Sequence, residues 1–343
     1  MPILKKGWII LREMSLKDIK GQEIVIRYLK KILEKDSLPP TFIFSGTRGT
    51  GRLLTAKTFA KALNCLEEEF DSCDKCKNCI AIEQNVHPNV NIVKAAEGYL
   101  SIDDIRSISD FSFMPINGKY KINIIDNADT GTQEAFNSML KYFEEPPERT
   151  VNILIAENVG MIPETVRSRA VELKFKPLRT EVVEEILRSK GLNGETVELL
   201  AHISKGSLER VEFYLKKNVL EGRKSFIKYF LEFLKDERPV AQVILQWKTF
   251  YMDSFDKESA DFLLENISDI VQDILAVSCT KDTEHIINID FLGYFADRFF
   301  TFPREKLESI FDILNEGKKA LLTNTNPMYI MFNVLFKIRE VIK

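Results

Sequence analysis

The segment 46–53 could bind phosphate, because its residues, Gly-Thr-Arg-Gly-Thr-Gly-Arg-Leu, follow the spacing of a P-loop. A competent P-loop runs G-x-x-x-x-G-K-[ST], since backbone amides wrap the phosphates, a lysine reaches the terminal ones and a hydroxyl ligates magnesium. Here Arg52 stands in the place of the lysine and Leu53 in the place of the hydroxyl. The glycines of the loop are Gly46, Gly49 and Gly51. The segment therefore predicts the fold of a nucleotide-driven protein without its working side chains.

An apolar segment at 121–129 ends in acidic residues and predicts the strand that completes such a site. In P-loop ATPases this strand supplies an aspartate for magnesium, commonly followed by a glutamate that activates water. Asp126 occupies the aspartate position, but Asn127 replaces the glutamate, and an amide cannot accept the proton. Asp126 either retains some metal binding or bonds backbone amides at the strand end. We predict no ATP hydrolysis here, and nucleotide binding at the three glycines, Arg52 and Asp126 that is weak or absent.

Four of the five cysteines lie within fifteen residues, in the pattern C-x7-C-x2-C-x2-C. They are Cys65, Cys73, Cys76 and Cys79. Each x2 spacing lets two thiolates converge on one ion, and four thiolates form a closed tetrahedral zinc site. We predict a structural zinc ion; reduced thiols, two disulfides and an iron–sulfur cluster are the alternatives. With this set complete, we expect the nearby His87 to be a loop residue and not a further ligand.

These residues require a parallel α/β domain to position them. A strand at 41–44 enters the P-loop, a helix at 53–63 leaves it, a helix at 133–143 ends before Pro146, and a buried strand covers 151–156. We place this domain, with the cysteine module at 65–79, in residues 1–175. Three short helices, at 182–188, 194–203 and 207–215, predict a lid domain over 176–221. Apolar residues at helical spacing predict an all-α domain over 222–343.

The composition limits the classes of function. The 343 residues are 45% hydrophobic, and 48 basic against 51 acidic residues give a net charge of -3. This balance excludes a general electrostatic grip on nucleic acid, although a local basic strip is compatible with it. No run of eighteen apolar residues is present, so we expect no membrane span. Residues 1–13 are too charged at both flanks to be a convincing secretion signal, and we expect a cytoplasmic protein.

Several short motifs, taken in order, give the chain a specific resemblance. They are Gly21-Gln22-Glu23, the P-loop, the cysteine module, His87-Pro88, Ile102-Asp103-Asp104-Ile105-Arg106, Asn137-Ser138-Met139-Leu140-Lys141, Glu144-Glu145-Pro146-Pro147 and Ser168-Arg169. Over residues 15 to about 215 this order resembles the AAA+ subunits of the bacterial DNA polymerase III clamp loader. The resemblance implies an α/β AAA+ P-loop domain with a zinc knuckle insert, a small helical lid and an all-α collar domain.

Within that family, the departures resemble the delta-prime pattern and not the gamma/tau motor pattern. Motor subunits carry the intact P-loop lysine and threonine, whereas delta-prime subunits tend to lose them and to keep the arginine of a Ser-Arg-Cys motif. Here Ala170 replaces the cysteine after Ser168-Arg169. Glu157 and Glu209 stand where motor subunits have a sensor threonine and a sensor arginine, and a carboxylate facing a triphosphate would repel it. The resemblance thus implies an inactive nucleotide site.

The same resemblance implies partners and a role. The chain would assemble with gamma/tau and delta subunits in a hetero-pentamer that places the sliding clamp on primed DNA. Arg169 would then act in trans on the ATP of the adjacent subunit; the simpler interpretation is that it pairs with a local carboxylate. Two rivals are a divergent gamma/tau-like ATPase in which Arg52 replaces lysine, and a zinc-dependent nucleic-acid-binding protein.

Overall fold

The computed structural model describes most of the chain. The described residues are 14–35, 38–94, 99–116, 118–138, 140–216, 219–235, 238–251, 256–280, 286–293, 303–321, 323 and 325–343. Residues 1–13 and Met139, both part of the sequence interpretation, lie outside them. Two compact units contain the described residues: an α/β unit from Met14 to Ile186 with Gly206–Glu209, and a helical unit of Leu187–Lys205 with Arg210–Lys343. The division at 175 and 221 stays a prediction.

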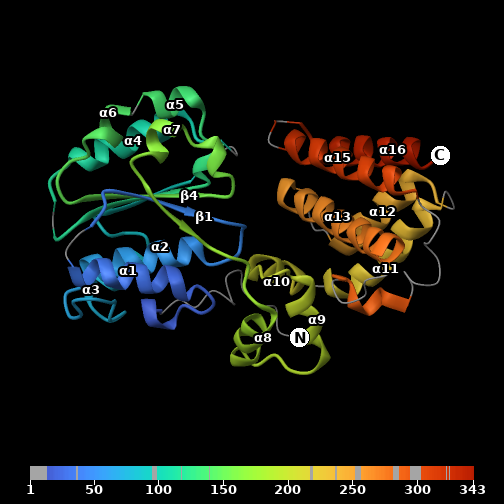
Figure 1. Ribbon diagram of the computed structural model, residues 1–343, viewed down its shortest axis with the longest axis horizontal. Coiled ribbons are helices and arrows are strands. Elements are labelled where there is room, and N and C mark those ends of the chain that lie inside the picture. Colours follow the sequence, from blue (N-terminus) through green and yellow to red (C-terminus); the bar gives the residue numbers. More distant parts are fainter. Residues whose placement is uncertain are drawn as a thin grey trace. The chain divides into compact units, whose positions relative to one another are not determined.

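A parallel sheet of five strands forms the centre of the α/β unit (Figure 1), which confirms the predicted parallel α/β class. The strand order is β2-β3-β4-β1-β5, with β1 at Thr41–Ser45, β2 at Val90–Lys94, β3 at Lys121–Asp126, β4 at Thr150–Ala156 and β5 at Val171–Lys174. The strands β1 and β4 pair directly, with Ser45 opposite Ala156. The residue that follows β4 therefore lies beside the start of the P-loop.

Helices cover both faces of this sheet (Figure 1). One face carries α1 (Glu23–Lys35), α2 (Arg52–Asn64) and α3 (Lys77–Glu83); the other carries α4 (Ile102–Phe113), α5 (Gln133–Asn137), α6 (Leu140–Glu144) and α7 (Glu164–Arg167). Successive side chains of a strand point to opposite faces. Accordingly Phe42 and Phe44 pack into the core under α1 and α2, while Ile43 packs into the core under α4.

Short 3-10 turns complete the α/β unit. They are η1 (Leu16–Asp18), η2 (Ala128–Thr130) and η3 (Val159–Met161). The helix α8 (Thr180–Ser189) begins in this unit and ends in the helical one.

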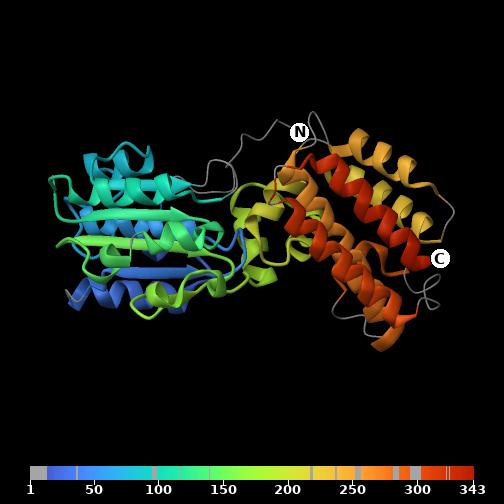
Figure 2. The ribbon, with the colours of Figure 1, turned by 90° about the horizontal axis from the view of Figure 1, so that it is seen from above.

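The elements of the helical unit are α9 (Glu195–Ile203), α10 (Leu208–Tyr214), α11 (Val219–Leu234), α12 (Val240–Tyr251), α13 (Lys257–Thr280), η4 (Ile289–Phe291), α15 (Arg304–Leu321) and α16 (Pro327–Ile342). In this unit, one apolar core is shared by α11, α12, α13, η4, α15 and α16. Figure 2 shows α15 and α16 side by side, and both contribute to the core. In the described part of the chain, none of the helices has the length and apolar character that crossing a membrane requires.

One predicted element differs in the structure. The continuous helix expected over 133–143 is interrupted at Ser138, where α5 ends. The Ser138 hydroxyl donates to the carbonyl of Ala135, 2.7 Å away. A serine that bonds the backbone of its own turn competes with the helical ladder.

Candidate functional site

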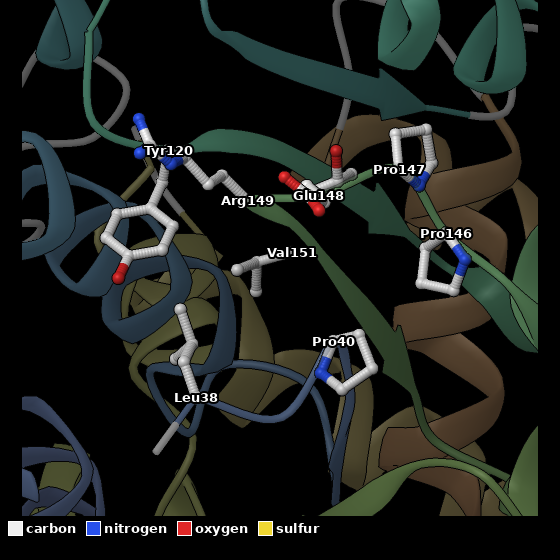
Figure 3. Close-up of a pocket in the computed structure, with 9 residues that line it drawn as sticks. Leu38, Pro40, Tyr120, Pro146, Pro147, Glu148, Arg149 and Val151 are labelled. Atoms are coloured by element: carbon white, nitrogen blue, oxygen red, sulfur yellow. The ribbon is translucent and has the colours of Figure 1, made fainter. Parts of the chain in front are cut away.

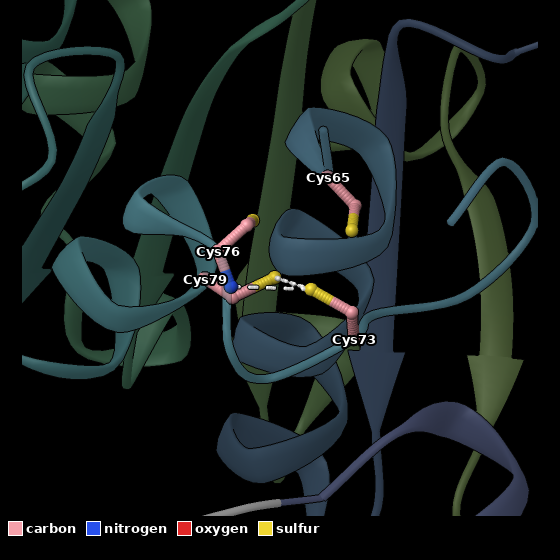
Figure 4. A group of neighbouring side chains, drawn as sticks. All are labelled: Cys65, Cys73, Cys76 and Cys79. Carbon is pink, nitrogen blue, oxygen red and sulfur yellow. Dashed lines mark hydrogen bonds between the residues drawn. The ribbon is translucent and has the colours of Figure 1, made fainter. Parts of the chain in front are cut away.

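The four cysteines converge at the junction of α2 and α3 (Figure 4). Cys65 follows the last turn of α2, Cys76 caps α3, and Cys79 lies in the first turn of α3. Cys73 comes from the connecting loop, in which Asp74 has a left-handed φ of 57°. The sulfur atoms of all four lie within 4.8 Å of one another. The prediction that these residues come together is confirmed.

This arrangement could hold a metal ion. Tetrahedral zinc with Zn–S bonds near 2.3 Å needs sulfur atoms about 3.8 Å apart, and the sulfurs of Cys73 and Cys79 are 4.0 Å apart. That separation is about twice the ~2.05 Å of a disulfide bond. The backbone N–H groups of Glu68 and Cys76 donate to the sulfurs of Cys65 and Cys73, at 3.3 and 3.2 Å. Such bonds favour the thiolate form that a metal requires.

The thiols also differ in acidity. Burial would raise the pKa of the Cys76 thiol, but backbone hydrogen bonds from Cys79 and Leu66 outweigh it and lower that pKa to about 7. Burial raises the pKa of the Cys73 and Cys79 thiols. One thiolate is thus favoured near neutral pH, and a bound cation would supply the charge that stabilises the others.

A buried lysine fastens the cysteine module to α2. Lys61 is 1% exposed, and its Nζ lies 2.5 Å from a carboxylate oxygen of Asp74 and 3.5 Å from one of Glu83. It also donates to the carbonyl of Met14, 3.1 Å away. The sequence does not predict this role, because a lysine within a helix gives no sign that it will be buried.

His87 does not join the cysteine cluster. It is 6% exposed, and its Nδ1 accepts a hydrogen bond from the backbone N–H of Asn89 at 3.1 Å. Burial lowers the pKa of this imidazole, so the neutral form is favoured. This agrees with the expectation that His87 is a structural loop residue.

The three glycines of the P-loop segment all have positive φ. Gly46, Gly49 and Gly51 have φ values of 139°, 74° and 92°, a region that favours glycine. A Cβ on Gly49 would lie 2.1 Å from the Ser207 hydroxyl and 2.7 Å from the backbone nitrogen of Glu209. The backbone N–H of Leu208 donates to the Gly49 carbonyl at 2.9 Å. The segment 207–209, which includes Glu209, therefore lies directly against the loop.

The basic side chains of the P-loop are paired with a carboxylate of the same chain. One carboxylate oxygen of Glu157 lies 2.5 Å from Nε of Arg48 and 3.8 Å from Nη2 of Arg52. Burial raises the pKa of Glu157, and the two guanidinium groups oppose that rise. The sequence predicted separate roles for Arg52 and Glu157. It did not predict the ion pair between them, or the ion pair between Arg48 and Glu157.

Asp126 lies at the end of β3, where the nucleotide interpretation expects it. Its carboxylate is 3.4 Å from Nζ of Lys94, at the end of the neighbouring strand β2. The nearby Asp129 accepts the backbone N–H groups of Glu157 and Asn158, at 3.0 and 2.9 Å. Asp129, and not Asp126, thus binds the backbone amides at the end of β4.

Arg169 lies just beyond α7 and is half-exposed. Its Nη2 donates to Glu144 at 3.1 Å, and its Nη1 donates to the carbonyl of Thr165 at 2.8 Å. A longer contact of 3.4 Å joins Nη1 to the Ser168 hydroxyl. None of these three partners belongs to the P-loop. Arg169 and the nucleotide-site residues of the same chain are therefore separate groups.

A cavity of about 440 Å³ lies at the amino ends of the strands, away from the P-loop (Figure 3). Its lining includes Leu38, Pro40, Tyr120, Pro147 and Val151. These residues precede or begin β1, β3 and β4, whereas ligands of parallel α/β sheets bind at the carboxyl ends of the strands. The cavity is thus separate from the nucleotide site.

Comparison with known proteins agrees with the sequence interpretation. A family model described as "DNA polymerase III, delta subunit" matches residues 21–179. The DNA polymerase III subunit delta' of Bacillus subtilis is 28% identical over 322 residues, which are 93% of this chain and 96% of that protein. DNA polymerase III subunit tau of Escherichia coli is 32% identical over 215 residues, or 60% of this chain but 33% of that protein. The match to delta' thus spans nearly the full length of both proteins, whereas the match to tau covers one third of the tau subunit.

Among solved structures, a gamma subunit-related protein from Thermotoga maritima has a TM-score of 0.47 and 18% identity, covering 92% of this chain and 99% of that one. The family match and the near full-length similarity to delta' agree with the motif order found in the sequence. The chain is similar to DNA polymerase III clamp-loader subunits and, over nearly its full length, to the delta' subunit of Bacillus subtilis.

Proposed function

We propose that this chain is a delta-prime-like clamp-loader subunit that does not hydrolyse ATP in its own nucleotide site. The observation that carries the proposal is the pairing of the P-loop arginines with Glu157. In a competent site the basic P-loop residue neutralises phosphate oxygens. Here that charge is already neutralised, the magnesium hydroxyl is replaced by Leu53, and Asn127 replaces the water-activating glutamate.

The chain would act through its neighbours. Arg169 would reach the ATP of the adjacent gamma/tau subunit and stabilise the charge that develops on the transferred phosphoryl group. Its position supports this role, because the side chain is 42% exposed and its partner Glu144 is 47% exposed. Exposed ion pairs contribute at most about 1 kcal/mol, so the guanidinium could exchange Glu144 for a phosphate at little cost.

The proposed assembly is a hetero-pentamer of this chain with gamma/tau and delta subunits in the cytoplasm. It would place the sliding clamp on primed DNA. Residues 176–221 would form a lid, and residues 222–343 would contribute to a collar that joins the subunits. The cysteine module would hold one structural zinc ion. This ion would stabilise the α2–α3 junction and take no part in catalysis.

Steady-state ATP turnover by the purified chain tests the inactive site. We expect turnover far below the usual enzyme range, whose lower end is about 1 per second. The control is a gamma/tau subunit assayed in parallel. Turnover by this chain in that range would favour the divergent gamma/tau-like ATPase instead.

Copurification from the native cell tests the partners. We expect the chain to be recovered with gamma/tau and delta subunits. Isolation as a lone protein that binds DNA by itself would contradict the assembly and favour the zinc-dependent DNA-binding alternative.

A further inference from the structure

A carboxylate from the end of β4 lies against the arginines of the P-loop. Glu157 follows β4, which pairs with β1 so that Ala156 lies opposite Ser45 at the entrance to the loop. One oxygen of Glu157 contacts both Arg48 and Arg52, at 2.5 and 3.8 Å. One carboxylate thus contacts both guanidinium groups of the loop, and the charges of Asp129 and Asp126 also act on Arg52.

The burial of Arg52 makes such a charge necessary. The residue is 6% exposed, and a guanidinium removed from water needs a counter-charge close by. In a nucleotide-binding P-loop, phosphate oxygens and backbone amides meet this need together. In the described part of the chain, Nη1 of Arg52 has no hydrogen-bond acceptor. The buried cation is thus neutralised in part, and its Nη1 could donate to a further anionic oxygen once the charge of Glu157 is removed.

The backbone around Glu157 is fixed independently of the arginines. Asp129 accepts the N–H groups of Glu157 and Asn158, so it determines where the Glu157 side chain starts. The carbonyl of Gly49 is bound by the N–H of Leu208 on the other side of the loop. The loop is thus held between the end of β4 and the segment 207–209 by contacts within the chain.

We propose that Glu157 is an intramolecular substitute for the nucleotide phosphate, which neutralises Arg48 and Arg52 and closes the P-loop to anions. This inference rests on the proposed inactive site and explains how the loop keeps its shape there. It follows that removal of the Glu157 charge converts the loop into a binding site for a di- or triphosphate group.

The test is the substitution Glu157→Gln in the full chain, with inorganic pyrophosphate as the probe in a calorimetric titration. Glutamine keeps the size of the side chain and removes the charge, so we expect pyrophosphate to bind at least about tenfold tighter than to the unaltered chain. Glu185→Gln is the matched control, because Glu185 forms an ion pair with Lys20 in the same unit, 2.6 Å apart. The double variant Glu157→Gln with Arg52→Gln should lose the gain.

If Glu157→Gln weakens the fold, the melting temperature measured with and without pyrophosphate still reports binding. Pyrophosphate should then raise the melting temperature of this variant more than that of the unaltered chain or Glu185→Gln, because a ligand stabilises the state that binds it. Equal responses in all three proteins, or a gain that survives in the double variant, would overturn the inference. ATP turnover by the unaltered chain would instead refute the proposed function, so the two failures are distinguishable.

Discussion

Lys61 is the single residue on which the attachment of the cysteine module most depends. Its ammonium group is buried between Asp74 and Glu83, and removing one partner of a buried ion pair leaves the other uncompensated. We predict that Lys61→Met lowers the free energy of unfolding by about 3 kcal/mol, measured by urea denaturation. The matched control is Lys20→Met, whose partner Glu185 is exposed, and which should cost at most about 1 kcal/mol. Equal losses in the two variants would contradict the assigned role.

The sequence predicts the contacts of a residue when its partners lie close to it along the chain. The cysteine spacing identified all four sulfur ligands, because two tight turns bring them together within fifteen residues. The pairing of Glu157 with Arg48 could not be found in this way. It arises from the pairing of β4 with β1, which joins segments more than a hundred residues apart.

At the scale of elements, the cysteine module should behave as a metal-dependent unit. We predict one zinc ion per chain by metal analysis after gentle purification. Cys76→Ser should lose that ion and increase hydrogen exchange in α3, because metal binding free energy is partly folding free energy. The exchange of the central strand β4 should stay unchanged as an internal control. A metal-free protein with four freely titrating thiols would refute this prediction.

The P-loop offers a matched pair of glycines with different surroundings. Both Gly49 and Gly51 have positive φ, but a Cβ on Gly49 would strike Ser207 and Glu209, whereas one on Gly51 meets nothing within 4 Å. Gly51→Ala should therefore cost about 1–2 kcal/mol from backbone strain alone. Gly49→Ala should cost roughly 3 kcal/mol or more, because overpacking adds to the strain. Equal stability of the two variants in urea would show that segment 207–209 does not pack on the loop.

Elements that are buried on all sides were easier to predict than elements at an edge. The strands around 41–44 and 151–156 were identified because they are continuous apolar runs, and β1 and β4 are buried throughout. The edge strands β2 and β5 were not identified, since each has exposed or half-exposed positions that interrupt the apolar pattern.

At the scale of the whole molecule, the order of motifs predicted the resemblance to clamp-loader subunits, whereas the boundary between the two compact units did not follow from the sequence. The predicted lid segment 176–221 contributes to both compact units, with α8 beginning in one and α9 lying in the other. Such a division depends on tertiary packing, which the helical spacing of apolar residues alone does not define. The three-domain division is therefore a proposal that only the assembled complex can test.

The central claim is that this subunit contributes to a neighbour's ATP site and not to its own. The most direct measurement is ATP turnover in a reconstituted clamp loader in which only the motor site adjoining this chain is active. Arg169→Ala should leave assembly intact and slow that site by at least about 10³-fold, and Arg169→Lys should rescue it poorly, because an ammonium lacks the planar fork. Arg179→Ala in the same complex is the control for the loss of one positive charge. Unchanged turnover in a correctly assembled Arg169→Ala complex would contradict the account.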